Sequence, residues 1–267
     1  MNLDKQEAIW WGEFKLHNQQ TLQWRIGPLT LLVRNIADEW QIAYERADEM
    51  HENTLACEIT ETDLSPDTLA NNSRYFIRDH SGILHLKPRL ADRPIVSRPW
   101  QPFHLTAGEE VTLYVSSPLW IELAVGEKAE KLVEVAIQRP SDTWFGPSTR
   151  EGELCYASRT SCRLDLAEVP WRPHRAITPV LIRNQADSLL SLERLSLPVP
   201  FLPVYSTVNG NLWTPTVILV REEDGDMAAL KIEKHAPAEA GQATLVDEPR
   251  SRVSTGTLFR AFNALFS

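Results

Sequence analysis

Residues 170–205 read PWRPHRAITPVLIRNQADSLLSLERLSLPVPFLPVY, and this stretch decides the fold class. An apolar run around Val180 is interrupted by the polar residues 184–188, and apolar residues then resume at mostly alternate positions over 190–199. Side chains of a strand point alternately to its two faces, so this spacing predicts half-buried strands with a loop between them. The prolines near the end cannot donate to a ladder and indicate an edge strand or a strand end. We interpret the stretch as the centre of a β-sandwich domain.

The same pattern recurs along the chain. Leu22, Trp24 and Ile26 alternate before the dipeptide Gly27-Pro28, and two alternating runs, 111–115 and 119–125, are separated by Ser116-Ser117-Pro118. Eighteen prolines, eleven glycines and nine tryptophans suit short strands joined by turns better than long helices. We therefore expect a mainly β protein with two tandem antiparallel β-sandwich domains, residues 1–140 and 141–234, and a short amphipathic helix at the C-terminus.

Charge is unevenly placed in the first domain. Residues 38–67 contain ten acidic residues and one arginine, a local net charge of −9 that equals the net charge of the whole chain. Like charges repel and favour an extended chain, so we expect a solvated acidic loop over 45–72. The alternative is a calcium site, although no EF-hand spacing is present. The acidic balance excludes nucleic acid as an expected partner, because phosphate binding depends on clustered lysine and arginine.

Near the end of the chain, the spacing of the apolar residues changes from the alternation of strands to the spacing of a helix. Residues 235–253 are rich in Ala, Pro and Gly and are expected to form a linker, and residues 254–267 are expected to form an amphipathic helix. The helical spacing concerns five apolar residues, which we predict as partner-binding: Leu258, Phe259, Phe262, Leu265 and Phe266. This helix either docks on its own domain or engages a membrane-protein partner or the membrane surface.

Several classes of protein are disfavoured. The first residues lack the basic start and apolar core of a secretory signal, and no window approaches the roughly 18 consecutive apolar residues of a membrane span. We therefore expect a cytoplasmic protein that is peripheral to the inner membrane through its tail. Three cysteines without a CxxC pair predict reduced, buried thiols. No Walker loop, GxGxxG, HExxH or GxSxG is present, so no catalytic residue, metal site or cofactor is predicted.

Two enzymatic alternatives stay open. Cys155 and His174 could form the nucleophile of a Cys-dependent hydrolase, because an imidazole can lower the pKa of a thiol. His80 and His85 approach each other if the chain makes a hairpin at Gly82, and with His104 they could ligate a metal.

The tryptophans suggest a carbohydrate-binding module as a further alternative. Flat indoles on a sheet stack on sugars or on proline-rich segments, whereas the opposing interpretation is core packing. Seven of them lie near turns or strand ends: Trp10, Trp11, Trp100, Trp120, Trp144, Trp171 and Trp213.

Four groups of residues resemble a known family. They are Trp24-Arg25-Ile26-Gly27-Pro28-Leu29 with Glu39-Trp40; Trp144-Phe145-Gly146 with Gly152-Glu153-Leu154-Cys155-Tyr156-Ala157; Pro173-His174-Arg175-Ala176 with Thr178-Pro179-Val180; and Leu197-Pro198-Val199. In these strings, and over nearly the whole chain, the sequence resembles an uncharacterised family of archaea and gammaproteobacteria known as a domain of unknown function, family 432. The resemblance implies an accessory role beside a small-conductance mechanosensitive channel, and it transfers no active-site residue.

The sequence therefore predicts a soluble, non-enzymatic interaction protein. The alternatives are a carbohydrate-binding module and a metal- or Cys-dependent hydrolase.

Overall fold

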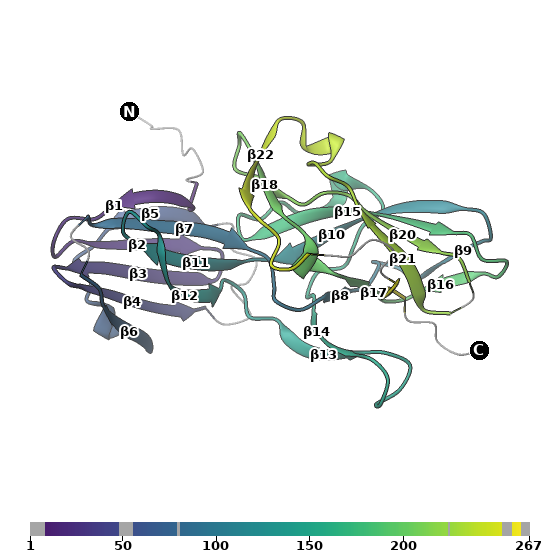
Figure 1. The fold of residues 1–267 in the computed structure, drawn as a ribbon, viewed down its shortest axis with the longest axis horizontal. Coiled ribbons are helices and arrows are strands. Elements are labelled where there is room, and N and C mark those ends of the chain that lie inside the picture. The colour runs from purple at the N-terminus through teal and green to yellow at the C-terminus, as the bar shows by residue number, and fades with distance from the viewer. Residues whose placement is uncertain (1–8, 48–55, 79–80, 224, 253–257, 263–267) are drawn as a thin grey trace. The chain divides into compact units, whose positions relative to one another are not determined.

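The computed structural model describes residues 9–47, 56–78, 81–223, 225–252 and 258–262 (Figure 1). In these ranges the chain consists of strands and loops, and its helical segments are 3₁₀ turns of three residues, so the predicted mainly β class is confirmed. The chain divides into two compact units, and each is built from separate stretches. Unit 1 contains residues 1–89, 119–138 and 172–174, and unit 2 contains residues 90–118, 139–171 and 175–267.

Unit 1 contains two antiparallel sheets. The four-stranded sheet has the order β1 (Gly12–Lys15), β7 (Ile83–Arg89), β11 (Trp120–Val125) and β12 (Glu130–Ala136). The five-stranded sheet has the order β5 (Cys57–Glu61), β2 (Thr21–Ile26), β3 (Leu29–Ile36), β4 (Glu39–Arg46) and β6 (Asn71–Phe76) (Figure 1).

The β2–β3 hairpin shows how the sequence encodes this unit. Gly27 and Pro28 join the two strands, and Gly27 has a φ of +52°. A positive φ at the first turn position is what a type II′ turn needs, and glycine adopts it without the steric cost of a Cβ. Trp24 pairs with Leu31 and both side chains are 0% exposed, which confirms the alternation predicted for this stretch.

Contacts between the two sheets close unit 1. The ring of Phe14 on β1 meets Trp24 on β2 edge to face, with 5.2 Å between ring centroids. The Nε–H of Arg46 on β4 also donates to the carbonyl of Ala136 on β12 at 2.8 Å. These two contacts join strands of the five-stranded sheet to strands of the four-stranded sheet.

β15 (Arg175–Asn184) is the central strand of unit 2. β10 (Glu110–Pro118) pairs antiparallel with it, and β19 (Leu212–Trp213) and β20 (Val217–Arg221) pair parallel with it. The sheet is completed by β18 (Val204–Thr207), β21 (Met227–Ile232), β22 (Ala243–Asp247) and β23 (Leu258–Arg260). Most residues of β15 are buried, as expected for a strand covered on both faces.

Two smaller sheets and four 3₁₀ turns complete the described structure. One sheet has the order β13 (Ser141–Phe145), β14 (Glu153–Ala157), β8 (Ile95–Ser97) and β17 (Leu195–Leu197), and β16 (Leu190–Leu192) pairs with β9 (Phe103–Leu105). The turns are η2 (Pro66–Thr68), η3 (Leu166–Glu168), η4 (Val199–Phe201) and η5 (Ala238–Ala240). In residues 170–205 the first apolar run forms a strand as predicted, although β15 is mostly buried and not half-buried. The second run, predicted as one strand over 190–199, is divided into β16 and β17, which belong to different sheets.

The expected all-antiparallel pairing is wrong in unit 2. β15 runs parallel to β19 and β20, and β14 runs parallel to β8. Parallel neighbours need a long crossover connection. Between β15 and β20 the chain passes through residues 185–216, which themselves form short strands, and apolar alternation carries no information about strand direction.

The predicted segments also differ from the structure in their bounds. Residues 90–118 belong to unit 2, whereas the predicted N-terminal domain 1–140 includes them. The predicted linker 235–253 contains η5 and β22, and β22 pairs with β18, so this prediction is wrong. An exposed edge strand tolerates the same polar and small residues as a linker. In the predicted acidic loop 45–72, β5 and η2 are ordered, and residues 48–55 lie outside the described ranges.

The predicted C-terminal helix is wrong for its described part. Residues Leu258–Arg260 form β23, which pairs antiparallel with β21, and Phe262 forms a bridge with Leu195. The remaining residues predicted as helix, 254–257 and 263–267, lie outside the described ranges. The spacing of the apolar residues also suits a short strand, whose backbone gains partners from the edge of the sheet.

Candidate functional site

The candidate site is a cleft in unit 2, which we call the Trp100 cleft. Two segments form most of it: residues 99–103, which join β8 to the start of β9, and residues 162–168, which include η3. The main-chain N–H of Trp100 donates to the carbonyl of Cys162 at 3.1 Å, and Pro99 and Cys162 form a parallel bridge. Pro99 and Pro102 cannot donate to a ladder, so the first segment leaves the sheet and forms a wall.

The cleft has an apolar floor and exposed aromatic and aliphatic walls. Its volume is about 350 Å³. Leu113 and Cys162 on the floor are each 1% exposed, whereas the side chains of Trp100 and Leu164 on the walls are 65% and 58% exposed. Phe103 adds a second aromatic ring to the lining. Large apolar side chains that stay exposed around a hollow are characteristic of a binding site.

Arg163 orients the indole of Trp100. Its guanidinium carbon lies 4.1 Å from the centroid of the Trp100 ring, which is within the range of a cation–π contact. The main chain of Arg163 is fixed by reciprocal hydrogen bonds with Tyr114 on β10, at 2.8 and 3.1 Å. The arginine therefore covers one face of the indole and holds the ring at the cleft wall.

Two carboxylates lie in the lining of the Trp100 cleft. Asp165 caps η3, since its Oδ1 accepts a hydrogen bond from the main-chain N–H of Ala167 at 2.9 Å, and the residue is exposed in the lining. Glu168 is exposed in the lining. The positive charge of Arg163 lies in the same lining, so the two carboxylates leave one net negative charge around an apolar surface, which suits a ligand that is both apolar and cationic.

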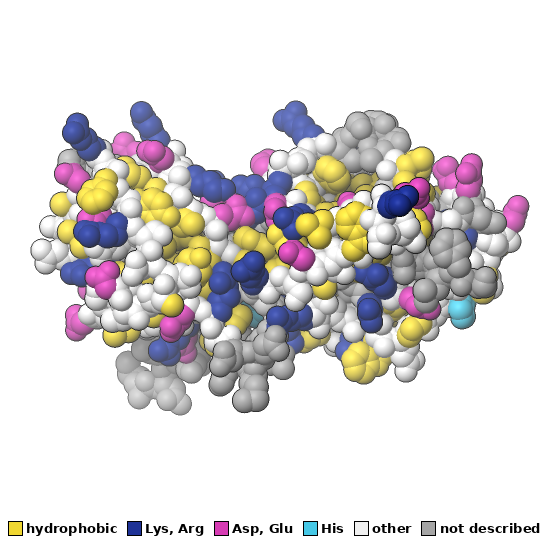
Figure 2. Space-filling view, turned by 90° about the horizontal axis from the view of Figure 1, so that it is seen from below, with side chains coloured by type: hydrophobic (Ala, Val, Ile, Leu, Met, Phe, Trp, Pro, Cys, Tyr) yellow, Lys and Arg dark blue, Asp and Glu magenta, His cyan; other side chains and the backbone are white. Residues whose placement is uncertain are grey.

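Exposure alone does not identify a site on this protein. Figure 2 shows hydrophobic side chains scattered among acidic and basic ones over one face of the molecule, and single exposed apolar residues are normal on protein surfaces. The Trp100 cleft differs because several such residues surround one hollow.

The tryptophans predicted as ligand platforms fall into two groups. Trp10 and Trp213 are buried, at 0% and 2% exposure. Trp100, Trp144 and Trp171 are exposed, at 65%, 42% and 38%. Trp11 and Trp120 are intermediate. The carbohydrate-binding alternative therefore survives for three of the seven residues.

Three of the five residues predicted to bind a partner are described by the structure, and they differ in exposure. Phe259 and Phe262 are 9% and 1% exposed, so they pack inside unit 2 and present no surface to a partner. Leu258 is 62% exposed, and its predicted role stays a prediction. Leu265 and Phe266 lie outside the described ranges.

The residues of the enzymatic alternatives are held in structural roles. The Cys155 thiol is 0% exposed, and burial raises its pKa to about 12, so at neutral pH it is a thiol and a poor nucleophile. His174, its predicted partner, belongs to unit 1, where its ring packs under Gly27. His85 shares a hydrogen bond of 2.9 Å between its Nε2 and the carbonyl of Gly126.

The predicted histidine hairpin is wrong as well. β6 and β7, which flank the expected turn, belong to different sheets of unit 1, and His80 lies outside the described ranges. Among the residues that the structure describes, no group of three or more His, Cys, Asp or Glu side chains could hold a metal ion.

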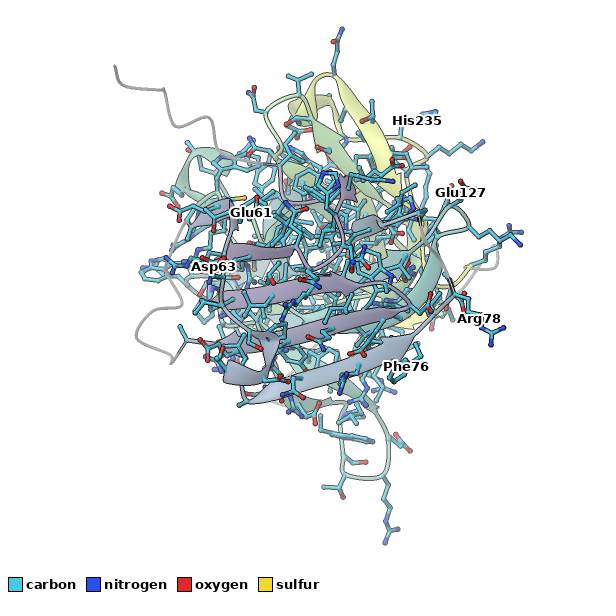
Figure 3. All side chains as sticks on the ribbon, turned by 90° about the vertical axis from the view of Figure 1, so that its left-hand side faces the viewer. Glu61, Asp63, Phe76, Arg78, Glu127 and His235 are labelled. Carbon is cyan, nitrogen blue, oxygen red and sulfur yellow. The ribbon has the colours of Figure 1, made fainter. Side chains whose placement is uncertain are left out.

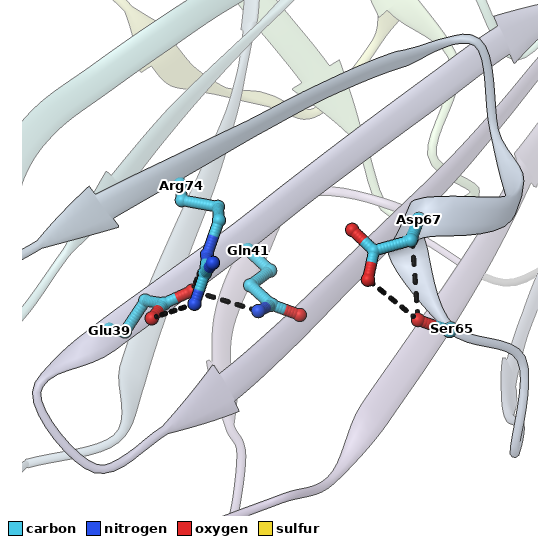
Figure 4. A network of polar contacts seen from close by, with 5 residues as sticks. All are labelled: Glu39, Gln41, Ser65, Asp67 and Arg74. Atoms are coloured by element: carbon cyan, nitrogen blue, oxygen red, sulfur yellow. Dashed lines mark hydrogen bonds and ion pairs between the residues drawn. The ribbon is translucent and has the colours of Figure 1, made fainter.

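A polar network covers part of the five-stranded sheet (Figure 4). Arg74 on β6 donates from Nη2 to Oε2 of Glu39 at 2.7 Å and from Nε to its Oε1, and Gln41 Nε2 donates to Oε1 at 2.8 Å. These hydrogen bonds, that from Arg74 above all, lower the pKa of Glu39. Phe76, at the end of the same strand, is 75% exposed (Figure 3). Each charge in the network has a partner, which favours a structural role.

Sequence reasoning identified Trp100 but missed the residues around it. Arg163, Asp165 and Glu168 sit in the string CRLDLAEVP, which carries no motif. A usable signal was the Asp165-Leu-Ala-Glu168 pattern, in which a capping residue precedes a short turn.

Comparison with protein-family models shows to which family the chain belongs. The model described as "Protein of unknown function (DUF432)" matches residues 10–267. The chain belongs to the DUF432 family. The resemblance inferred from the four groups of residues is thereby confirmed. Comparisons of this DUF432 protein with curated proteins and with solved structures gave no match. In the described parts of the DUF432 chain, no helix has the length and hydrophobicity that crossing a membrane requires.

Proposed function

We propose that this DUF432 protein is a non-enzymatic interaction protein whose Trp100 cleft binds an extended, proline-containing segment of a partner protein that also carries a basic side chain. The observation that carries the proposal is the exposed indole of Trp100, 65% accessible, held by Arg163 over an apolar hollow with carboxylates at its rim.

The apolar surface of the cleft supports an extended proline-containing ligand. Polyproline II segments dock in aromatic-lined grooves, and they lose little entropy because their conformation is already restricted. Trp100 and Phe103 supply aromatic rings, and Leu164 supplies an aliphatic wall that can pack against pyrrolidine rings. A cavity of about 350 Å³ suits a few side chains of such a segment, with the remaining peptide outside it.

The charges of the cleft support the basic side chain. Asp165 and Glu168 place two carboxylates in the lining, and a lysine or arginine of the ligand can pair with them without deep burial. The net charge of −9 attracts a basic partner over a longer range and raises the association rate at low salt. An acidic peptide is disfavoured by both effects.

The family resemblance seen in the sequence is what supports a particular partner. We propose a cytoplasmic segment of a membrane channel as the source of the ligand, which makes this protein cytoplasmic and peripheral to the inner membrane. Attachment of the protein to the membrane channel then depends on the Trp100 cleft and not on a C-terminal helix.

The two facing antiparallel sheets of unit 1 support the proposal that this unit is a β-sandwich.

Short synthetic peptides test the proposal directly. We expect a proline-rich peptide with one arginine to bind in isothermal titration, and Trp100→Ala to weaken binding at least tenfold, as for a central aromatic anchor. Glu168→Lys should weaken the same peptide and favour one in which glutamate replaces the arginine. Trp171→Ala is the matched control, because it removes an exposed tryptophan elsewhere in unit 2.

Two outcomes contradict the proposal. One is the absence of binding by any proline-rich basic peptide to the full-length protein. The other is equal binding of such peptides to the Trp100→Ala variant and to the unmodified protein.

A further inference from the structure

Unit 2 contains a second cleft, which we call the Trp171 cleft. It has a volume of about 260 Å³ and lies between the turn that joins β18 to β19 and the η5 turn. Its lining combines two tryptophans, Trp171 and Trp213, with the polar residues Thr207, Asn209, Asn211, Glu239 and Gln242. None of these residues belongs to the lining of the Trp100 cleft.

The tryptophans form a supported platform. Trp171 is 38% exposed, and its ring meets that of Trp213 with 5.2 Å between centroids and an interplanar angle of 62°. Trp213 is 2% exposed and packs in a buried cluster with Val169, Ile177 and Ala240. Because Trp213 is fixed in the core, its contact supports the ring of Trp171, which is part of the cleft lining and supplies it with exposed apolar surface.

The polar wall of the cleft is held by its own backbone. The main-chain N–H of Thr207 donates to the carbonyl of Asn211, and the N–H of Gly210 donates to the carbonyl of Thr207, each at 3.0 Å. The N–H of Asn211 also donates to Thr207 Oγ1 at 3.1 Å. Gly210 has a φ of +79°, which this tight turn requires. These hydrogen bonds close the turn that carries Asn209 and Asn211 in the cleft lining.

The opposite wall supplies a carboxylate. The hydroxyl of Tyr114 donates to Oε1 of Glu239 at 3.2 Å, and burial, together with the nearby Glu239 charge, raises the pKa of that hydroxyl, which keeps it protonated. The second oxygen of Glu239 can accept a hydrogen bond from a ligand. Gln242 lies near it with an exposed amide. Amide and carboxylate groups are good partners for hydroxyls, since an amide both donates and accepts.

We propose that the Trp171 cleft binds the pyranose ring of a neutral sugar. One face of a pyranose presents C–H groups that pack on the indole of Trp171. Its hydroxyls radiate from the ring edge, where they can meet the amides of Asn209 and Gln242 and the carboxylate of Glu239. This combination of one apolar face and a polar edge matches the cleft in both of its surfaces.

Size and charge narrow the ligand further. A volume of about 260 Å³ is slightly below the roughly 300–1,000 Å³ of typical ligand pockets, so the cleft takes one sugar residue and not a longer chain. Nucleotides and sugar phosphates bring negative charge against Glu239 and against a protein of net charge −9. Anionic sugars and nucleotides are therefore disfavoured, and a neutral sugar is the ligand to test.

Saturation-transfer difference NMR on the full-length protein tests the assignment. The probes are glucose, galactose, mannose and N-acetylglucosamine, each at millimolar concentration. We expect at least one of them to receive saturation at its ring C–H protons, and Trp171→Ala to abolish that transfer. Trp100→Ala serves as the matched control and should leave it unchanged.

A second variant separates loss of the site from loss of the fold. Asn209→Ala removes an exposed side chain from the loop tip and should weaken the same sugar at least threefold, with the thermal transition of the protein unchanged. Transfer to none of the four sugars overturns the proposal. Transfer that persists at full intensity in the Trp171→Ala protein overturns it as well.

Discussion

Substitution of Phe262 by alanine tests whether the end of the chain is part of unit 2 or a free anchor. The side chain of Phe262 is 1% exposed, and its main chain forms a bridge with Leu195. Truncating a fully buried phenylalanine typically costs about 3–5 kcal/mol, from lost burial and the cavity that is left. That loss is a large part of the roughly 5–15 kcal/mol by which domains are stable. We therefore expect Phe262→Ala to unfold unit 2 at markedly lower urea concentration.

Leu258→Ala is the matched control, because Leu258 is 62% exposed on the adjacent strand. Its expected effect is within about 0.5 kcal/mol, as for most surface changes. Urea unfolding followed by tryptophan fluorescence gives the midpoints, and hydrogen exchange of β21, which pairs with β23, reports whether the loss is in unit 2. Equal midpoints for the two variants, with β21 equally protected, would refute the docking of this segment and favour a tail that is free to bind a partner.

Three further predictions concern the fold. Gly27→Ala should cost about 2–4 kcal/mol in urea unfolding, because a Cβ there would lie 2.3 Å from Nδ1 of His174 at a positive φ. Gly108→Ala, also at positive φ but with open space around it, should cost only about 1 kcal/mol, and equal losses would contradict the packing argument. Glu39 has a lowered pKa in the folded protein, so the stability that it contributes is present above its unfolded-state pKa near 4.5 and is lost as the pH falls through its folded-state pKa. Glu39→Gln should therefore flatten the dependence of Tm on pH in the acid range. An unchanged profile of Tm against pH would count against the ion pair. Cys155, with a pKa of about 12, should resist thiol reagents at pH 8 until the protein is unfolded, and rapid native labelling detected by mass spectrometry would disprove its burial.

Local hairpins could be predicted from the sequence because their signals are local. The strands flanking Gly27-Pro28 alternate, and the turn needs a residue that tolerates positive φ, so residues 21–36 specify their own pairing. The same holds for β20 and β21, which pair antiparallel on either side of an acidic turn containing glycine. In both cases the turn and the partner strand lie within one short window.

Pairings between distant strands could not be predicted in this way. The two alternating runs 111–115 and 119–125 are both placed in the N-terminal domain by the sequence analysis, yet β10 pairs with β15 in unit 2, and β11 pairs with β7 in unit 1. Ser116 was interpreted as part of a break, but it lies within β10 and is 3% exposed. Its hydroxyl accepts a hydrogen bond from Arg175 Nε at 2.9 Å, so a distant arginine satisfies a polar residue that looks unsuited to a buried strand.

The candidate site shows the same limit. The sequence identifies Trp100 as one of seven tryptophans near turns or strand ends, whereas Arg163 has no such signal. The two side chains meet only because Trp100 and Cys162 are joined by a main-chain hydrogen bond in the folded unit. A cleft built from two loops that are far apart in sequence has no periodicity to detect, since each loop is irregular by itself.

The strings that carry the family resemblance occupy structural positions, and this bears on where the function lies. Gly27 and His174 come from two different strings, and the structure packs one against the other inside unit 1. Arg175 is 3% exposed and donates from Nη2 to Thr160 Oγ1 at 2.9 Å. Gly152 has a φ of +154° and lies against the indole of Trp144 in the β13–β14 hairpin. Groups that are enclosed in this way maintain the fold and offer no surface to a ligand. Trp144 and Leu154 are exceptions within these strings, since they are 42% and 45% exposed. The linings of the Trp100 and Trp171 clefts contain no residue of the four strings, so the two proposed binding sites can be altered without touching them.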